Sequence, residues 1–231
     1  VCITCVAGSY SVSGEAQTSI DVCLACAAGR YSTVGEGQTS SIVECDNKCS
    51  AGKWSDQDGL VSDAQCTSCV SGRYSTAGEE QTSIDVCKAC TAGRYSVSGE
   101  AQTSINVCLA CDAGQYSIAG EGQSSVAVCD NKCSAGKWSD QVGLISDSDC
   151  TSCLHGRYSI AGEGQNSIAI CDNKCSAGKW SDQDARTSDA ECLGKCSAGK
   201  WSGTTGLASD DECTACIGGR YSISKVEQTS I

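Results

Sequence analysis

The stretch C-K-A-C-T-A-G-R-Y-S-V-S-G-E-A-Q-T-S-I, from Cys87 to Ile105, is one copy of a motif that recurs along the whole chain. The first cysteine recurs every 21 residues, with a single step of 22 caused by an extra serine at Ser40–Ser41. Eleven repeats account for all 231 residues, which predicts one continuous array over 1–231. The repeats start at Cys2, Cys23, Cys45, Cys66, Cys87, Cys108, Cys129, Cys150, Cys171, Cys192 and Cys213.

The repeats are of two types. Seven place two residues between their cysteines and carry tyrosine, as in Cys2 to Ile20, and four place three residues there and carry tryptophan. The longer cysteine step is balanced by one residue fewer in the loop that follows, so the advance from repeat to repeat is constrained. Solenoids usually carry atypical capping repeats at their ends, and none is evident here. We therefore expect a portion of a longer array.

The composition argues against an ordinary hydrophobic core. The chain has 22 cysteines, no proline, methionine or phenylalanine, and only 5% aromatic residues. So few large apolar side chains cannot offset the conformational entropy of a domain of this size without cross-links. The net charge of −12 disfavours binding to nucleic acid or to anionic membranes, because both require a basic surface. The apolar runs are also too short to insert into a membrane.

Short strand-prone segments and turns fill each repeat. The G-x-[YW]-S and T-S-I-x-V stretches favour short strands separated by a turn, and no helical periodicity is evident. These features predict a small disulfide-rich fold, mainly β and irregular, arranged as an elongated tandem array without a large core. We expect each aromatic ring to pack on a neighbouring disulfide, and contacts to lie mainly between adjacent repeats.

Two chemistries compete for the cysteines. The spacing of Cys2, Cys5, Cys23 and Cys26 fits a zinc ribbon. However, each zinc would bind two cysteine pairs, so eleven pairs would leave one pair without a partner. The repeats also do not alternate in a way that would determine which neighbouring pair shares each zinc. A cysteine-dense chain without a large core is typical of a secreted, disulfide-linked scaffold. The sequence therefore favours disulfides and predicts no metal or cofactor site.

The connectivity of these disulfides is not fixed by the sequence. A bond within each C-x-x-C is one alternative, but so short a loop stabilises little. Joining the second cysteine of one repeat to the first of the next closes a loop of about 18 residues, which contributes roughly 3 kcal/mol. This favoured pattern leaves Cys2 and Cys216 for repeats outside the 231 residues. Its pairs are Cys5–Cys23, Cys26–Cys45, Cys49–Cys66, Cys69–Cys87, Cys90–Cys108, Cys111–Cys129, Cys133–Cys150, Cys153–Cys171, Cys175–Cys192 and Cys196–Cys213.

The pattern C-x-x-G-x-Y-S followed by C-x-x-C, as in Cys26 to Ser32 and Cys45, resembles the cysteine-rich repeats named after the ephrin type A/B receptor. Similar loops open tumour-necrosis-factor-receptor-like domains. The resemblance covers the whole array and implies an elongated extracellular structure in which disulfides join the cysteines that flank G-x-Y. This chain lacks the proline common after the cysteine in those families and the additional cysteines of a ligand-binding receptor domain.

An invariant serine follows each aromatic residue. Its hydroxyl either bonds to a local turn, which we favour, or accepts an O-linked glycan on an extracellular fibre. These candidate glycan acceptors are Ser11, Ser32, Ser55, Ser75, Ser96, Ser117, Ser139, Ser159, Ser181, Ser202 and Ser222.

Nothing in the pattern indicates catalysis. His155 is the only histidine, and it stands in a variable position with no serine or cysteine nucleophile specially placed beside it. No constellation supplies acid, base and oxyanion donors together, so we expect no enzyme.

The expected function is mechanical. The strict period predicts a secreted structural rod, the subunit of an extracellular filament or surface appendage, which self-associates head-to-tail or laterally. The alternative is the stalk of a receptor or adhesin whose ligand-binding domain lies outside these residues. A metal-storing thiolate protein is a third hypothesis, and it requires free or metal-bound thiols.

Overall fold

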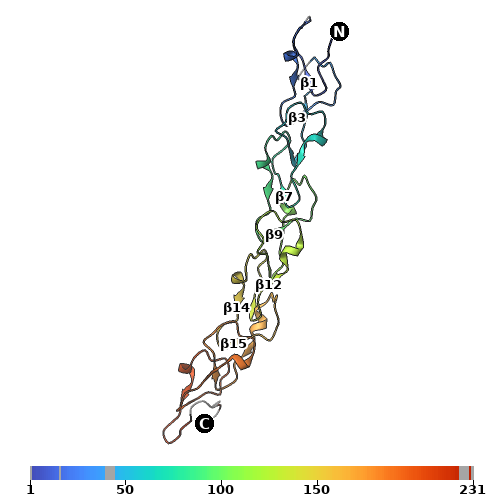
Figure 1. The fold of residues 1–231 in the computed structure, drawn as a ribbon. Coiled ribbons are helices and arrows are strands. Elements are labelled where there is room, and N and C mark those ends of the chain that lie inside the picture. Colours follow the sequence, from blue (N-terminus) through green and yellow to red (C-terminus); the bar gives the residue numbers. More distant parts are fainter. Residues whose placement is uncertain (1, 16, 40–44, 224–228, 230–231) are drawn as a thin grey trace. The chain divides into compact units, whose positions relative to one another are not determined.

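The computed structural model describes residues 2–15, 17–39, 45–223 and 229. The extra serine step at 40–41 lies outside the described residues. Contacts divide the chain into two compact units, an N-terminal one (1–109 with 121–126) and a C-terminal one (110–120 with 127–231). Both units are built from the same succession of small loops, turns and two-residue strands (Figure 1).

Two-residue strands form the regular backbone structure of each repeat. The residue before each aromatic and the aromatic itself pair antiparallel with residues between the cysteines of the next repeat. The pairs are β1 (Ser9–Tyr10) with β2 (Leu24–Ala25), β3 (Arg30–Tyr31) with β4 (Asn47–Lys48), β5 (Lys53–Trp54) with β6 (Thr67–Ser68), β7 (Arg73–Tyr74) with β8 (Lys88–Ala89), β11 (Gln115–Tyr116) with β12 (Asn131–Lys132), β13 (Lys137–Trp138) with β14 (Thr151–Ser152), β15 (Arg157–Tyr158) with β16 (Asn173–Lys174), β17 (Lys179–Trp180) with β18 (Gly194–Lys195) and β19 (Lys200–Trp201) with β20 (Thr214–Ala215). The equivalent strands β9 and β10 are Arg94–Tyr95 and Leu109–Ala110.

The T-S-I-x-V segment is not a strand, and this part of the sequence prediction is wrong. It forms a single 3₁₀ turn, because the preceding serine caps the turn: Ser83 Oγ accepts a hydrogen bond from the Asp85 backbone N–H at 3.1 Å. The short turns are η1 (Ile20–Val22), η2 (Asp63–Gln65), η3 (Ile84–Val86), η4 (Ile105–Val107), η5 (Val126–Cys129), η6 (Asp147–Asp149), η7 (Ile168–Cys171), η8 (Asp189–Glu191) and η9 (Asp210–Glu212).

Cysteines make up most of the buried hydrophobic residues. Apart from them, the buried hydrophobic residues among those described are Leu60, Tyr74 and Leu207. Tyr74 packs against Cys90 and Cys108, which form one disulfide, and equivalent clusters contain Tyr31 and Trp180. The expected packing of rings on disulfides is therefore confirmed in these clusters. As in a small secreted scaffold, the cross-links replace a core.

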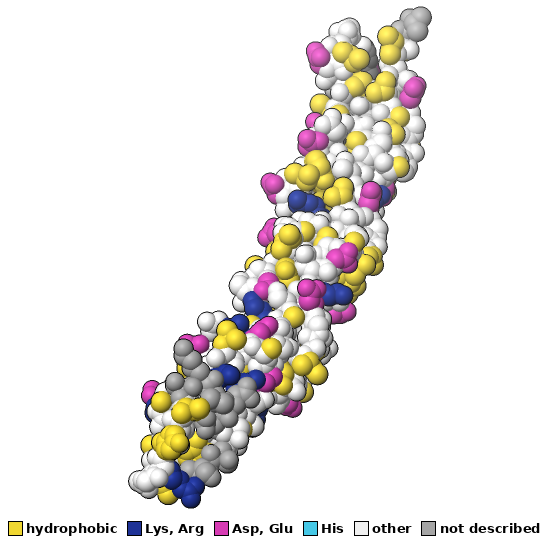
Figure 2. All heavy atoms as spheres, turned by 60° about the horizontal axis from the view of Figure 1, so that its bottom comes forward, with side chains coloured by type: hydrophobic (Ala, Val, Ile, Leu, Met, Phe, Trp, Pro, Cys, Tyr) yellow, Lys and Arg dark blue, Asp and Glu magenta, His cyan; other side chains and the backbone are white. Residues whose placement is uncertain are grey.

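Many apolar side chains remain on the surface. Figure 2 shows hydrophobic groups interspersed with acidic ones on the face in view. They include Ile84 and Ile105 of the 3₁₀ turns, each 57% exposed. Two grooves of about 410 Å³ each lie beside Ile84 and Ile105, next to Trp54 and Tyr74 respectively. They occupy equivalent places in successive repeats and are features of the repeat rather than a single specialised cavity.

Candidate functional site: the junction between repeats

A tight turn follows the second cysteine of each repeat. In the Cys66 repeat, the Arg73 N–H donates to the Val70 carbonyl at 3.0 Å, and Gly72 has φ +82°. This left-handed conformation suits glycine because a Cβ would be strained there. The turn aims Tyr74 toward the next repeat, where it pairs with Lys88. The invariant G-x-[YW] sequence thus builds the side of the repeat that meets its neighbour.

Backbone hydrogen bonds join each repeat to the next at three recurring places. The Cys90 N–H donates to the Gly72 carbonyl at 2.9 Å, the Ala101 N–H to the Cys69 carbonyl at 2.8 Å and the Ser75 N–H to the Gln102 carbonyl at 2.8 Å. The last of these bonds accompanies a parallel bridge between each aromatic and the loop of the following repeat, and nine such bridges occur in the described residues. Because these bonds use the main chain, the junction depends little on the variable side chains.

The glycine turn also touches the repeat after the next. A Cβ on Gly72 would lie 2.2 Å from the carbonyl oxygen of Gly122, two repeats downstream. The same approach recurs within the C-terminal unit, where a Cβ on Gly156 would lie 2.3 Å from the Gly206 carbonyl oxygen. Contacts therefore extend beyond adjacent repeats, which the sequence analysis did not anticipate. In the sequence, this close approach is indicated by the invariance of the glycine, because a turn alone would also tolerate asparagine.

Ten disulfides lock the junctions. They join the second cysteine of one repeat to the first of the next, in the same ten pairs that the loop arithmetic favours, with Cα–Cα distances of 5.3–5.8 Å. Cys2 and Cys216 are free. The disulfides occupy the thiols that a zinc ribbon or a thiolate store would need. Among the described residues, no group of three or more His, Cys, Asp or Glu is placed to hold a metal ion.

The serine after the aromatic closes a local turn in most repeats, whereas the Ser222 hydroxyl bonds to Gly199 and Lys200 of the preceding repeat. Ser75 Oγ accepts a hydrogen bond from the Ala77 N–H at 3.2 Å, which is the bonding that we favoured over a glycan. Ser32, Ser55, Ser75, Ser96, Ser117, Ser139, Ser159, Ser181 and Ser202 are at most 4% exposed. A buried hydroxyl leaves no room for a sugar, which argues against O-glycosylation of the folded chain at these nine positions. Ser11 and Ser222 are only partly buried.

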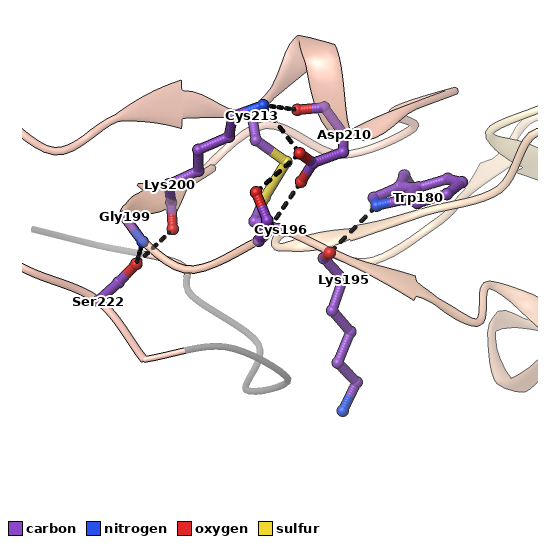
Figure 3. A network of polar contacts seen from close by, with 9 residues as sticks. Trp180, Lys195, Cys196, Gly199, Lys200, Asp210, Cys213 and Ser222 are labelled. Carbon is purple, nitrogen blue, oxygen red and sulfur yellow. Dashed lines mark hydrogen bonds and ion pairs between the residues drawn. A yellow bond between two sulfur atoms is a disulfide. The ribbon is translucent and has the colours of Figure 1, made fainter.

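The tryptophan-type repeats contain an ion pair that the sequence analysis missed. Lys53 Nζ lies 2.6 Å from Asp63 Oδ2, and the Ser50 N–H donates to Asp63 Oδ1 at 2.8 Å. Figure 3 shows the equivalent pair of Lys200 and Asp210, beside the Cys196–Cys213 disulfide. The other two pairs are Lys137–Asp147 and Lys179–Asp189. In the sequence, this ion pair is indicated by the lysine of K-W and the aspartate of S-D, which are ten residues apart in all four repeats.

These contacts set the charge state of the aspartate. Burial alone would raise the pKa of Asp63, but the hydrogen bonds from Lys53 and Ser50 outweigh burial and hold this pKa below its ordinary value. Asp147, Asp189 and Asp210 show a lowered pKa for the same reasons. Each loop is thus fastened to the turn after the second cysteine by a carboxylate that stays ionised.

Acidification is expected to loosen this fastening. Since the folded pKa of Asp63 is lower than the unfolded one, its contribution is complete above the ordinary carboxyl pKa of about 4. It is lost as the pH falls through the lowered folded value, by roughly 0.5–1 kcal/mol for a partly exposed pair. The measurement is hydrogen-exchange protection of the Ser50 amide, corrected for intrinsic rates, between pH 7 and pH 2.

Asp63→Asn is the matched variant, because it keeps an acceptor for the Ser50 amide but removes the charge. Its Ser50 protection should no longer change with pH, whereas the Ser134 amide, which donates to Asp147, should still titrate in the same sample. Equal acid sensitivity of Ser50 in the variant and the parent would contradict the assignment.

Glu80 links three repeats. Its carboxylate binds the guanidinium of Arg30 and lies 3.0 Å from Lys48 Nζ. The hydrogen bonds from Arg30 and Lys48 lower the pKa of Glu80. Because Arg30 stands two repeats before Glu80, this side-chain contact spans the same interval as the glycine contact described above.

His155 belongs to a surface contact. Its backbone N–H donates to Asp184 Oδ1 at 2.8 Å, and its Nδ1 lies 3.5 Å from the same oxygen. Both side chains are about half exposed, and the contact joins repeats rather than activating a nucleophile. Across the described ranges, no helix combines the length and the apolar character needed to cross a bilayer.

No protein-family model matches the chain, and a search of curated proteins finds no significant relative. The tandem array of cysteine-rich repeats with sequential disulfides and small strand pairs is established by the structure itself. The resemblance to ephrin-receptor-like repeats rests on the loop pattern alone.

Proposed function

We propose that the chain is a secreted structural protein, the subunit of an extracellular filament or surface appendage, in which disulfide-linked repeats form a stiff rod. The observation that carries this proposal is the recurrence of one junction, with its disulfide and three main-chain hydrogen bonds, along the array. Repeating contacts of this kind distribute load over many equivalent places. Ten disulfides favour maturation in an oxidising compartment.

The repeats also lack the local differences that a binding module would need. Binding sites concentrate their energy in a few residues, whereas exposed apolar residues recur along this array and the two grooves occupy equivalent places. The same argument applies to catalysis, which requires one specialised constellation. A structural role, in contrast, requires only the disulfide and main-chain hydrogen bonds that the repeats have in common.

Electron microscopy of native material purified without reductant tests this function. Filaments with an axial period that fits 21-residue repeats are expected, and treatment with reductant should dissolve them. Short rods that end in a globular head would contradict the proposal and favour the stalk of a receptor or adhesin. Discrete compact particles would exclude both structural roles.

A further inference from the structure

A carboxylate neutralises two facing cations in the N-terminal unit. Arg30 and Lys48 stand directly opposite each other in the β3–β4 strand pair. Like charges in this arrangement repel each other, but the Glu80 carboxylate binds the Arg30 guanidinium and lies 3.0 Å from Lys48 Nζ. Arg30 Nη1 also donates to the Cys45 carbonyl at 3.2 Å. The three side chains thus form a closed cluster in which one carboxylate serves both cations.

The same two cations recur in the C-terminal unit. Arg157 and Lys174 stand opposite each other in the β15–β16 strand pair. Arg157 Nη1 donates to the Cys171 carbonyl at 3.2 Å. The Arg157 guanidinium is therefore held by the same main-chain bond as that of Arg30, and it faces a lysine in the same register.

Gly206 takes the place of Glu80 in this second cluster. The Gly206 N–H donates to the Cys175 carbonyl at 2.8 Å, as the Glu80 N–H donates to the Cys49 carbonyl at 3.0 Å. Both residues have a left-handed backbone, with φ of +81° at Gly206 and +64° at Glu80. A Cβ on Gly206 would lie 3.2 Å from Lys174 Cδ. The loop therefore follows the same path beneath the lysine and differs in having no carboxylate there.

No other carboxylate of the described residues serves both cations. Asp172 Oδ1 lies 4.0 Å from Arg157 Nη1, which is beyond hydrogen-bond distance, and the Asp172 side chain is 81% exposed. None of the described carboxylates lies within 4.0 Å of Lys174 Nζ. Arg157 and Lys174 are thus two facing cations without a shared counter-charge, on a chain whose net charge is −12.

The chain also carries exposed carboxylates on loops that are held in place. The glutamate of the G-E loop is exposed in four repeats, at Glu79, Glu100, Glu121 and Glu163. In each of these loops a glutamine side chain donates to the main-chain carbonyl of the glutamate, as Gln81 Nε2 does to Glu79 at 2.9 Å. The main chain is therefore restrained while the carboxylate is accessible. Such a group forms charge-assisted hydrogen bonds with guanidinium and ammonium groups.

We propose that Arg157 and Lys174 bind a carboxylate over Gly206, and that an exposed glutamate of the G-E loop of a second copy supplies it. The inference rests on the proposed function and names one side-by-side contact between copies of the structural subunit. Charge complementarity favours this partner, because chains of net charge −12 repel each other except where a cation pair meets an acidic loop. The Glu80 cluster shows how these two cations accept a glutamate.

Zero-length cross-linking tests the proposal on the full, disulfide-bonded chain. An equal mixture of isotopically labelled and unlabelled chains is treated with a carbodiimide, which joins an amine to a carboxylate in direct contact. We expect mixed-label peptides, and therefore links between copies, that join Lys174 to a glutamate of the G-E loop. Links of Lys174 that stay within one chain, or that are no more frequent between copies than those of Lys132, would overturn the proposal.

Lys132 is the matched control for Lys174. It faces Gln115 in the β11–β12 strand pair, and its Cδ lies 3.2 Å from the Cβ position of Gly164. It therefore has the same setting with a single cation. Lys174→Gln should weaken the association of copies at low salt roughly fivefold, the effect of losing one ion pair at a surface. Lys132→Gln should leave the association constant from sedimentation equilibrium unchanged, and equal effects would overturn the site.

A second variant fills the site from within the chain. Gly206→Glu should bring its carboxylate to Arg157 and Lys174, as in the Glu80 cluster, and so exclude the second copy. The carbodiimide links of Lys174 should then run to position 206, and those between copies should disappear. Gly164→Glu meets the same backbone conformation and the same lysine contact without the arginine, and should leave the links of Lys174 as they are. Links between copies that persist in a folded Gly206→Glu variant would overturn the proposal.

Native material separates this inference from the proposed function. Filaments in which Lys174 is not linked to another copy, or is linked to a different molecule, would overturn the second copy as partner and leave the structural role intact. Links between copies in oligomers that never form filaments would support the carboxylate site and overturn the filament. Filaments with Lys174 linked to a glutamate of the G-E loop between copies would support both. Absence of filaments and of these links would overturn both.

Discussion

Complete reduction of the disulfides is expected to unfold the array at room temperature without any denaturant. The buried hydrophobic residues among those described are almost all cysteines, so the apolar surface left after reduction cannot offset the entropy of the chain. Each closed loop of 17–19 residues contributes about 3 kcal/mol through the entropy of the unfolded chain. Amide resonances should collapse to the random-coil range, and trypsin should cleave at lysine and arginine throughout the chain.

A single junction can be tested in the same way. Replacing Cys90 and Cys108 together by serine should lower the local stability by about 3 kcal/mol, measured by hydrogen exchange at the Gly122 amide, which donates to the Cys90 carbonyl. Replacing the free Cys2 and Cys216 should leave that amide unchanged. A native spectrum after full reduction would contradict the argument, because it would require another source of stability.

Features that depend on covalent loop length and on the 21-residue period could be predicted from the sequence. Loop closure favoured disulfide partners such as Cys90 and Cys108, and one ring per repeat predicted the packing of Tyr74 on that disulfide. The 3₁₀ turn at Ile84–Val86 was missed, because β-branched residues favour strands locally while the capping bond of Ser83 decides the conformation. Strand propensity therefore predicted the wrong conformation at a place where a serine side chain forms a hydrogen bond with the backbone.

Contacts over two repeats could not be deduced either, because they depend on the rotation from one repeat to the next. The approach of Gly72 to Gly122 and the pairing of Arg30 with Glu80 both span this interval. The period of 21 residues determines how often the junction recurs along the chain. It does not determine which surfaces of repeats two apart come into contact. The turn alone does not require glycine in every repeat. The invariance of this glycine was therefore the one sign in the sequence that another segment of backbone approaches it closely.

The two types of repeat use different polar contacts to hold the residue before the aromatic ring against a neighbouring segment. In four tyrosine-type repeats an arginine before the ring, such as Arg73, donates to the carbonyl of the first cysteine of the next repeat. In tryptophan-type repeats a lysine, such as Lys53, pairs with the aspartate ten residues later. Both fasten the variable loop to the rigid strand pair, so the types can be interspersed without changing the junction. Of these two fastenings, only the lysine–aspartate pair should respond to acid.

Gly72→Ala is expected to disrupt the junction over two repeats. The substitution places a Cβ 2.2 Å from the Gly122 carbonyl oxygen at a residue with φ +82°. Left-handed backbone costs an alanine about 1–2 kcal/mol, and overpacking against rigid main chain adds about 1–3 kcal/mol. Protection of the Gly122 and Cys90 amides from hydrogen exchange should fall by roughly 2–5 kcal/mol in total.

Two other glycines of the chain separate these costs. Gly199 has the same φ of +82° but no described residue within 4 Å of its Cβ position, so Gly199→Ala should show only the backbone cost. Gly78 has neither positive φ nor a neighbour, and Gly78→Ala should be close to neutral. The order Gly72, Gly199, Gly78 is thus the expected order of destabilisation, each followed at the nearest junction amides. Equal effects at Gly72 and Gly199 would mean that the close approach over two repeats contributes nothing, and that adjacent contacts alone hold the array.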